Sequence, residues 1–181
     1  YMATVICITN QKGGVGKTTT AVNLAFFLAK SKKKTLLIDF DPQGNATSGL
    51  GVDKMPFEAD YEKEGISTTM SEVLLGQKEL SDIILNTKFK ELDLAPVTPQ
   101  LANAEVNLAK LDKKFVQLRE AIKRVKNLYD YIIIDSPPSL SLLTVNGMIA
   151  SDYLLLPVQT EFYALEGVAQ LLDSVKLVRK A

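Results

Sequence analysis

Residues 4–30 carry the clearest structural signal in the chain and read TVICITNQKGGVGKTTTAVNLAFFLAK. This stretch opens with a short apolar run rich in β-branched residues, Thr4–Ile8, which is typical of a buried strand. It closes with a nearly all-apolar run from Thr18 to Lys30, which is long enough for a helix. The glycine-rich residues between them predict a tight loop that joins the end of the strand to the start of the helix.

The loop itself has the composition of a phosphate-binding site. Its glycines let backbone amides turn inward, and the following helix directs its free amides and positive dipole end at the same point. Lys17 supplies a cation for the β- and γ-phosphates, and the Thr18 hydroxyl is placed to bind Mg²⁺. The alternative is a glycine-rich turn with unrelated lysines. We expect ATP or ADP with Mg²⁺ as cofactors, bound by Gln11, Lys12, Gly13, Gly14, Val15, Gly16, Lys17, Thr18 and Thr19.

Four further runs have strand character: Thr35–Ile38, Tyr131–Ile134, Tyr153–Val158 and, more weakly, Leu92–Ala95. The apolarity of the stronger runs is continuous rather than alternating, which indicates burial on both faces. With the helical patterns between them, they predict an α/β fold: a mostly parallel twisted sheet with helices on both faces, in three layers, as in P-loop NTPases. A chain of 181 residues is expected to form a single domain over 1–181.

In residues 99–127, apolar side chains recur at spacings of three and four, which is compatible with a coiled-coil seam. Because predicted strands flank the segment, we favour one long helix, or two with a break near Asp112, packed on the sheet. Residues 52–65 predict an exposed loop. A last helix begins at Glu161 or Phe162, and its pattern reaches the end of the chain without a stop signal. We therefore expect a C-terminal part of the domain to be missing.

Two acidic residues follow predicted strands, where ligands of open α/β sheets bind. Asp41 lies shortly after the run that ends at Ile38. Since the chain has no histidine, Asp41 is the candidate to orient the attacking water. Asp135 follows the apolar residues 132–134, a Walker B pattern whose aspartate holds Mg²⁺, usually through a water. Without the loop, these acids would indicate only a solvated turn and a capping residue.

Composition excludes several other classes of function. The chain has 21 basic and 21 acidic side chains, so any contact with nucleic acid must come from a local patch. With no histidine and one cysteine, neither a thiolate cluster nor an internal disulfide can form, and Cys7 is expected to be a buried thiol. No apolar stretch reaches the roughly 18 residues of a membrane span, and no signal peptide is visible. We expect a cytoplasmic protein without a membrane partner.

The loop departs from the usual phosphate-loop pattern, because Gln11 stands where that pattern has its first glycine and Lys12 follows it. With this deviant Walker A form, the sequence resembles the ParA/Soj/MinD group of P-loop ATPases. Residues 41–47 (DPQGNAT), 135–140 (DSPPSL) and 157–167 (PVQTEFYALEG) look like the chromosomal ParA/Soj branch. The resemblance covers nearly the whole chain outside the predicted loop.

The resemblance implies roles for individual residues. Lys12 matches the signature lysine, which reaches across a nucleotide-sandwich dimer to the partner's phosphates, and Lys17 matches the ordinary phosphate-loop lysine. Asp41 matches the aspartate that orients the water, so the implied catalytic residues are Lys12, Lys17 and Asp41. Asp39 matches a residue that supports the metal site. The predicted metal-binding residues are Thr18, Asp39 and Asp135.

The resemblance also implies a working cycle. ATP brings two subunits together as a homodimer, the dimer holds non-specific DNA, and a ParB-like partner stimulates hydrolysis. The result is a slow ATPase switch for chromosome or plasmid partition in a cytoplasmic, nucleoid-associated protein. The alternative is a MinD-like membrane-cycling ATPase or another cargo-positioning ATPase of this fold. DNA-contacting residues of the group lie largely toward the C-terminal end. A DNA-binding patch and a solvated face remain equal interpretations of Lys123, Arg124, Lys126, Lys176, Arg179 and Lys180.

Overall fold

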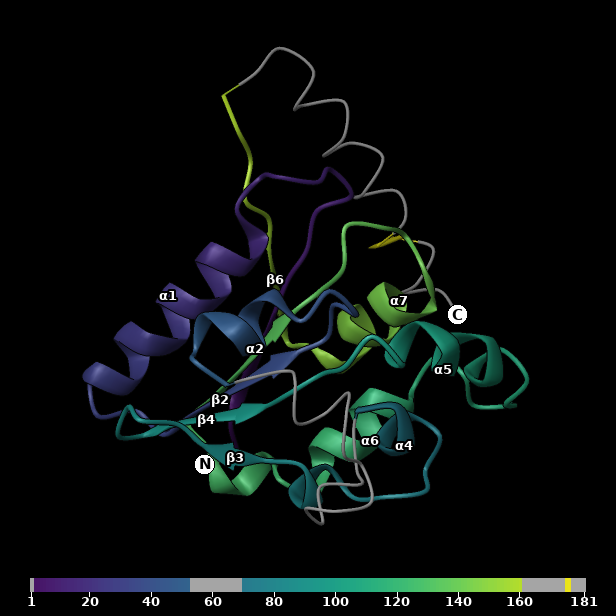
Figure 1. Cartoon of the computed structure of the whole chain (residues 1–181), viewed down its shortest axis with the longest axis horizontal. Coiled ribbons are helices and arrows are strands. Elements are labelled where there is room, and N and C mark those ends of the chain that lie inside the picture. Colours follow the sequence, from purple (N-terminus) through teal and green to yellow (C-terminus); the bar gives the residue numbers. More distant parts are fainter. Residues whose placement is uncertain (1, 53–69, 161–174, 177–181) are drawn as a thin grey trace.

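A computed structural model describes residues 2–52, 70–160 and 175–176 of the chain. Within these residues the strands form one six-stranded sheet in the order β3-β4-β2-β5-β1-β6. Figure 1 labels β2, β3, β4 and β6 of this sheet. Neighbouring strands are parallel except β3 and β4, which are antiparallel. The strands span Thr4–Ile8 (β1), Thr35–Asp39 (β2), Leu85–Asn86 (β3), Leu92–Ala95 (β4), Tyr131–Asp135 (β5) and Tyr153–Leu155 (β6).

The central strands are buried because they are apolar along nearly their whole length. All five residues of β2 are buried, and so are the last four of β5. In the register of the sheet, Asp135 lies opposite Ile8 of β1 on one side and opposite Asp39 of β2 on the other. The carboxyl ends of these strands therefore meet at one edge, which is where a sheet of this kind binds ligands.

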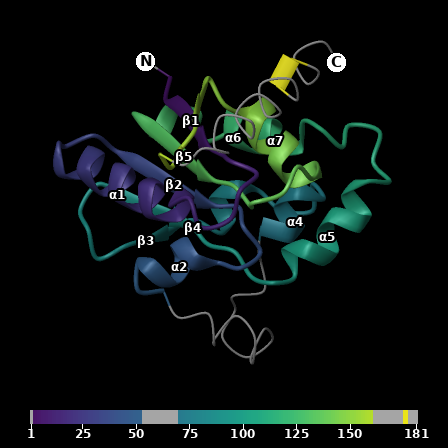
Figure 2. The same ribbon diagram turned by 90° about the horizontal axis from the view of Figure 1, so that it is seen from above.

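Helices cover both faces of the sheet and give three layers (Figure 2). α1 and α2 pack on one face, on a core that includes Leu37 and Ile133. The other helices pack on the opposite face, on the alternate strand residues such as Leu36 and Ile134. The helices span Lys17–Lys30 (α1), Asn45–Gly49 (α2), Met70–Leu74 (α4), Leu101–Leu108 (α5), Gln117–Lys123 (α6) and Leu142–Ala150 (α7), with 3₁₀ turns at Leu80–Asp82 and Lys126–Leu128.

The predicted α/β fold, its strands and its first helix are confirmed, with small changes at the element ends. β2 and β5 each extend by one residue, to Asp39 and Asp135. β6 ends at Leu155 rather than at Val158. The physical reason is Pro157, which has no N–H to donate to a strand ladder.

Residues 99–127 form two helices, α5 and α6, rather than a coiled coil. Turns that include Asp112 separate them, as the favoured interpretation predicts. Apolar residues of both helices are buried in the same core as the sheet; they are Leu101, Ala104, Leu108, Leu118 and Ile122. The spacing of three and four therefore reflects packing on the sheet.

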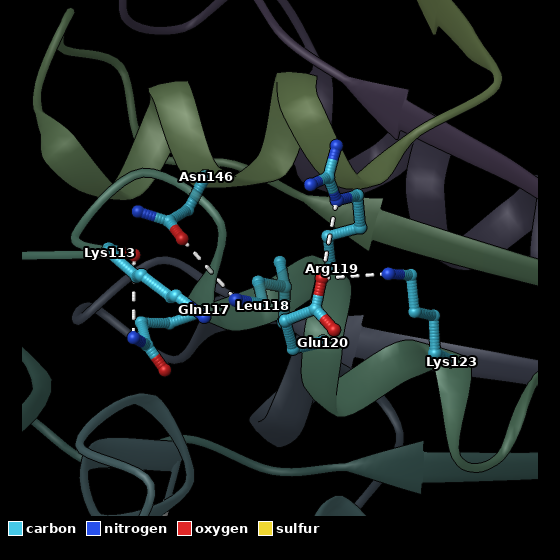
Figure 3. Close-up of polar contacts among 7 residues, drawn as sticks. All are labelled: Lys113, Gln117, Leu118, Arg119, Glu120, Lys123 and Asn146. Carbon is cyan, nitrogen blue, oxygen red and sulfur yellow. Dashed lines mark hydrogen bonds and ion pairs between the residues drawn. The ribbon is translucent and has the colours of Figure 1, made fainter.

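The sequence analysis gave helix α7 no bounds of its own, because LLTVNGMIA mixes glycine and β-branched residues and lacks a polar face. Ser141 caps it, and the Ser141 hydroxyl accepts a hydrogen bond from the N–H of Leu143 at 3.2 Å. Asn146 is fully buried in α7, and its Oδ1 accepts from the N–H of Leu118 at 3.3 Å (Figure 3). The Asn146 Nδ2 donates to the carbonyl oxygen of Lys114 at 2.7 Å, so tertiary contacts fix α6 on α7.

Two predictions fall largely outside the described residues: the exposed loop at 52–65 and the last helix, of which only residues 175–176 are described, as helical. Cys7 is buried in β1 as predicted, and burial raises the pKa of its thiol to about 12. In the ranges that the structure describes, no helix has the length and apolarity that crossing a membrane requires.

Candidate functional site

The glycine-rich loop lies between the end of β1 and the start of α1, at the edge of the sheet where β5 also ends. Gly14 and Gly16 have φ values of 74° and 86°, in the left-handed region that favours glycine. Gly16 immediately precedes α1, so the first amides of the helix, which lack helical partners, lie at the loop. A Cβ added to Gly14 or Gly16 would meet no other atom within 4 Å, so the loop borders open space.

Lys17, the first residue of α1, lies back across this loop. It is only 8% exposed, and its Nζ donates a hydrogen bond to the carbonyl oxygen of Lys12 at 3.1 Å. Burial lowers the pKa of Lys17, while the carboxylates of Asp135 and Asp41 act in the opposite direction and favour its charged form. Of the other predicted loop residues, Val15 is buried, Gln11, Gly16 and Thr18 are half-buried, and Lys12, Gly13, Gly14 and Thr19 are exposed.

Asp135 ends β5 in the middle of this edge and is fully buried. Neither of its carboxylate oxygens has a regular hydrogen-bond partner within the described residues. Burial, with the charges of Asp39 and Asp41, raises the pKa of Asp135 to about 7. Thr18 and Lys17 lower it, although the geometry of the Thr18 hydroxyl falls short of a regular hydrogen bond. Because a buried carboxylate without partners is costly, a cation beside Asp135 would stabilise this arrangement.

Asp39 and Asp41 are bound into the loop that follows β2. Asp39 is fully buried, and its Oδ2 accepts hydrogen bonds from the backbone N–H and the hydroxyl of Thr47, both at 2.7 Å. Its Oδ1 accepts from the N–H of Asp41 at 3.3 Å. The Oδ1 of Asp41 accepts from the N–H of Gln43 at 2.9 Å. Burial raises the pKa of Asp39 to about 6, although the hydrogen bonds that Asp39 accepts from Thr47 and from the N–H of Asp41 lower it. The metal-binding role of Asp39 stays a prediction.

The sequence analysis did not assign Asn10 and Gln159 to the site, because the contacts that join the loop to the chain after β6 span 147 and 145 residues. The Asn10 Nδ2 donates to the carbonyl oxygen of Pro157 at 2.8 Å, and its Oδ1 accepts from the N–H of Lys12 at 3.0 Å. The Gln159 Nε2 donates to the carbonyl oxygen of Gly14 at 3.3 Å. The chain after β6 thus braces the glycine-rich loop. No local pattern signals these contacts, although Gln159 lies in a segment that resembles the family.

The residues present fit a magnesium ion whose coordination a nucleotide completes. No cluster of three or more His, Cys, Asp or Glu side chains able to hold a metal occurs in residues 2–52, 70–160 or 175–176. The donors at this edge are oxygens: the Thr18 hydroxyl and the Asp135 carboxylate, beside the carboxylates of Asp39 and Asp41, which accept hydrogen bonds from their own loop. Oxygen is the ligand that Mg²⁺ prefers, and Mg²⁺ commonly keeps waters and substrate phosphates in its shell. Thr18 and Asp135 are therefore the side chains that would hold it.

A hollow of about 530 Å³ lies elsewhere, beside the last turn of α1. It is lined by Phe26, Ala29, Lys30, Lys32, Lys88, Phe89, Lys90 and Glu91. Because α1 begins at the glycine-rich loop and ends at Lys30, this hollow is at the opposite end of the helix and forms no part of the site.

The fold and the site together define the class of protein. A glycine-rich loop connects a central parallel strand to a helix whose first residue is a buried lysine, and a buried aspartate ends the neighbouring strand. This arrangement is that of a P-loop NTPase.

Comparison with known proteins gives the family. The profile of a family described as an AAA domain matches residues 3–181. The chain is 52% identical over 179 residues to the sporulation initiation inhibitor protein Soj of Bacillus subtilis (strain 168), covering 99% of this chain and 67% of that protein. It is 47% identical over 176 residues to the chromosome partitioning protein ParA of Myxococcus xanthus (strain DK1622), covering 97% of this chain and 59% of that protein. The chain belongs to the ParA/Soj family of P-loop ATPases.

A solved structure with the same fold is a cobyrinic acid a,c-diamide synthase from Mycobacterium smegmatis with bound ATP analog and magnesium. It matches with a TM-score of 0.88 and 35% identity, over 98% of this chain and 69% of that chain. Since proteins named for different activities share the fold, the fold alone does not decide the function. The chain spans 67% and 59% of the length of the two curated relatives named above.

Proposed function

We propose that this chain is the nucleotide-binding part of a dimerising ATPase that acts as a switch in chromosome or plasmid partition, and that residues 1–181 belong to one domain. The reactants are ATP and water, the products are ADP and phosphate, and the cofactor is Mg²⁺. The observation that carries the proposal is the fully buried Asp135 carboxylate without regular partners, at the edge where the glycine-rich loop and Lys17 lie. The relatives named Soj and ParA support the role in partition.

Within this proposal, each group at the edge has one task. The loop amides and Lys17 bind the phosphates, and Thr18 and Asp135 hold Mg²⁺, which neutralises phosphate charge when bound. Asp41 orients the attacking water, and the N–H of Gln43 at 2.9 Å fixes its carboxylate. Intrinsic turnover is slow, because positioning without an arginine finger leaves most of the barrier in place.

Lys12 is the proposed cross-subunit residue. It is exposed on the loop, whereas Lys17 is buried. In a dimer, Lys12 would reach the phosphates held by the partner subunit, so bound ATP would favour the dimer over the monomer. The ATP dimer would then hold non-specific DNA, and a ParB-like partner would stimulate hydrolysis and release it. These steps place the protein in the cytoplasm, associated with the nucleoid.

Nucleotide binding is tested by calorimetric titration of Lys17→Ala with ATP and Mg²⁺. We expect no measurable binding, because the cation beside the phosphates is lost. Lys30→Ala is the matched control, since it removes a lysine from the other end of the same helix, and it should bind like the wild type. Tight ATP binding by Lys17→Ala would rule out the assigned role of the loop.

Dimerisation is tested by light scattering with two variants. Lys12→Gln should bind ATP as a monomer and fail to dimerise, whereas Asp41→Ala should accumulate as an ATP-bound dimer with no turnover. Normal ATP-dependent dimerisation of Lys12→Gln would remove Lys12 from the subunit interface. Normal hydrolysis by Asp41→Ala would remove Asp41 from the mechanism.

The partition role is tested with full-length Asp41→Ala, non-specific duplex DNA and ATP or ADP, over a series of salt concentrations. Binding that requires ATP and weakens steeply with salt supports contacts to the DNA phosphates. An ATP-bound dimer that does not bind DNA but sediments with anionic lipid vesicles would favour the membrane-cycling alternative. A dimer that binds neither would indicate a different cargo.

A further inference from the structure

Thr47 lies at the far end of the loop that carries Asp41, and its hydroxyl connects two strands of the sheet. The Thr47 Oγ1 donates to the Oδ2 of Asp39 at 2.7 Å and accepts from the N–H of Val97 at 3.3 Å. Asp39 ends β2, whereas Val97 follows β4, the strand paired with β2. Thr47 and Asp39 are fully buried and Val97 nearly so, which excludes water from these bonds.

The same contact closes the loop on itself. Asp39 precedes the loop and Thr47 is in α2, eight residues later, so the hydrogen bonds between them join the two ends. Within this ring, the N–H of Gly44 donates to the carbonyl oxygen of Asp41 at 2.8 Å. The Oδ1 of Asp39 accepts from the N–H of Asp41 at 3.3 Å, so both the backbone N–H and the backbone carbonyl of Asp41 are held.

Helix α2 depends on this contact for its start. Gly44 occupies the N-cap position of α2 and supplies no side-chain hydrogen bond, so the first amides of the helix need another acceptor. The Oδ2 of Asp39 accepts the N–H of Thr47, which is the third residue of the helix, and thus replaces the missing cap. The Thr47 hydroxyl adds a second bond to the same oxygen and sets the direction from which Asp39 approaches.

We propose that Thr47 is a positioning residue for ATP hydrolysis, which holds Asp39 and thereby keeps the backbone of Asp41 where its carboxylate can orient the attacking water. The proposal rests on the proposed role of Asp41. Thr47 affects the rate of the chemical step. It does not affect the affinity for the nucleotide, because the glycine-rich loop that binds the nucleotide is a different segment of the chain. A misplacement of about 1 Å in such a group lowers turnover by as much as about 100-fold.

The test is steady-state ATP hydrolysis by the full-length protein with Mg²⁺, together with equilibrium binding of ATP, for four variants. Thr47→Val keeps the shape of the side chain and removes the hydroxyl, and Thr47→Ser restores it. Thr98→Val is the matched control, because Thr98 is also buried, follows β4, and has a hydroxyl without a regular partner among the described residues. Asp41→Ala reports on the proposed function itself.

We expect kcat of Thr47→Val to fall about 10- to 100-fold while its Kd for ATP changes by less than about threefold. Thr47→Ser and Thr98→Val should keep kcat within about threefold of the wild type. An unchanged kcat in Thr47→Val, or a parallel loss of kcat and ATP binding, would overturn the positioning role. If Thr47→Val does not fold, Thr47→Ala decides by the same two readouts.

The roles of Thr47 and Asp41 predict different results. Loss of turnover in Asp41→Ala with normal kcat in Thr47→Val refutes the role of Thr47 alone. Normal turnover in Asp41→Ala refutes the role of Asp41, and the role of Thr47 with it.

Discussion

Replacing Asp135 by asparagine should make the free energy of unfolding fall less steeply between pH 5 and pH 8, in protein without nucleotide or metal. Asp39, whose pKa is raised to about 6, contributes a further fall in both the wild type and the variant. Burial raises the pKa of Asp135 from 3.8 to about 7, so the folded protein keeps this proton up to about pH 7. The unfolded chain gives the proton up near pH 3.8. Between these values the unfolded state binds fewer protons, and the free energy of unfolding therefore falls as the pH rises.

The magnitude follows from the size of the window. Each pH unit inside it lowers the free energy of unfolding by up to about 1.4 kcal/mol. A rise from pH 5 to pH 8 crosses about two units of the window, up to the pKa of about 7, which amounts to about 3 kcal/mol. The buried amide of Asp135→Asn carries a cost of about 1–3 kcal/mol of its own, but this cost does not depend on pH.

The assay is urea unfolding of wild type and Asp135→Asn at pH 5 and pH 8 with a chelator present. Glu120→Gln is the control. In the wild type, a hydrogen bond from Lys123 lowers the pKa of Glu120 from 4.5. The stabilisation that ionised Glu120 contributes is therefore complete above pH 4.5 and is lost only at lower pH. Equal losses of stability in the wild type and in Asp135→Asn would refute the account of Asp135 as a buried, uncompensated acid.

Three further predictions concern packing and buried hydrogen bonds. Asn146→Ala removes the bonds that hold α6 on α7 and should lower the free energy of unfolding by about 2–4 kcal/mol in urea titrations. Gly147→Ala places a Cβ 3.1 Å from the Sγ of Cys7, so we expect a loss of about 1–3 kcal/mol that Cys7→Ala in the same chain relieves; additive losses would contradict this. Tyr129→Phe removes the 2.9 Å hydrogen bond to Asp93 and should cost about 1 kcal/mol, measured as a lower Tm.

Elements with a local signal could be predicted from the amino-acid sequence. Residues 4–30 specify strand, loop and helix through continuous apolarity, glycines and a lysine placed at the helix start, and β1 and α1 follow that pattern. β5 was predicted for the same reason, since a strand buried on both faces is apolar along its length, whereas β4 gave a weaker signal because Asp93 interrupts it. Lys17 and Asp135 could be singled out because each adjoins such an element.

Which side chains meet depends on how the layers of the fold pack. The register of the sheet sets Asp39 beside Asp135, and burial at that edge raises the pKa of both carboxyls. Helix α7 has weak helix propensity and is held by Asn146, whose partners precede it by about thirty residues. The contact of Thr47 with Val97 spans 50 residues. Such contacts are decided by how the layers pack, and packing depends on many distant residues at once, so no single stretch of sequence encodes it.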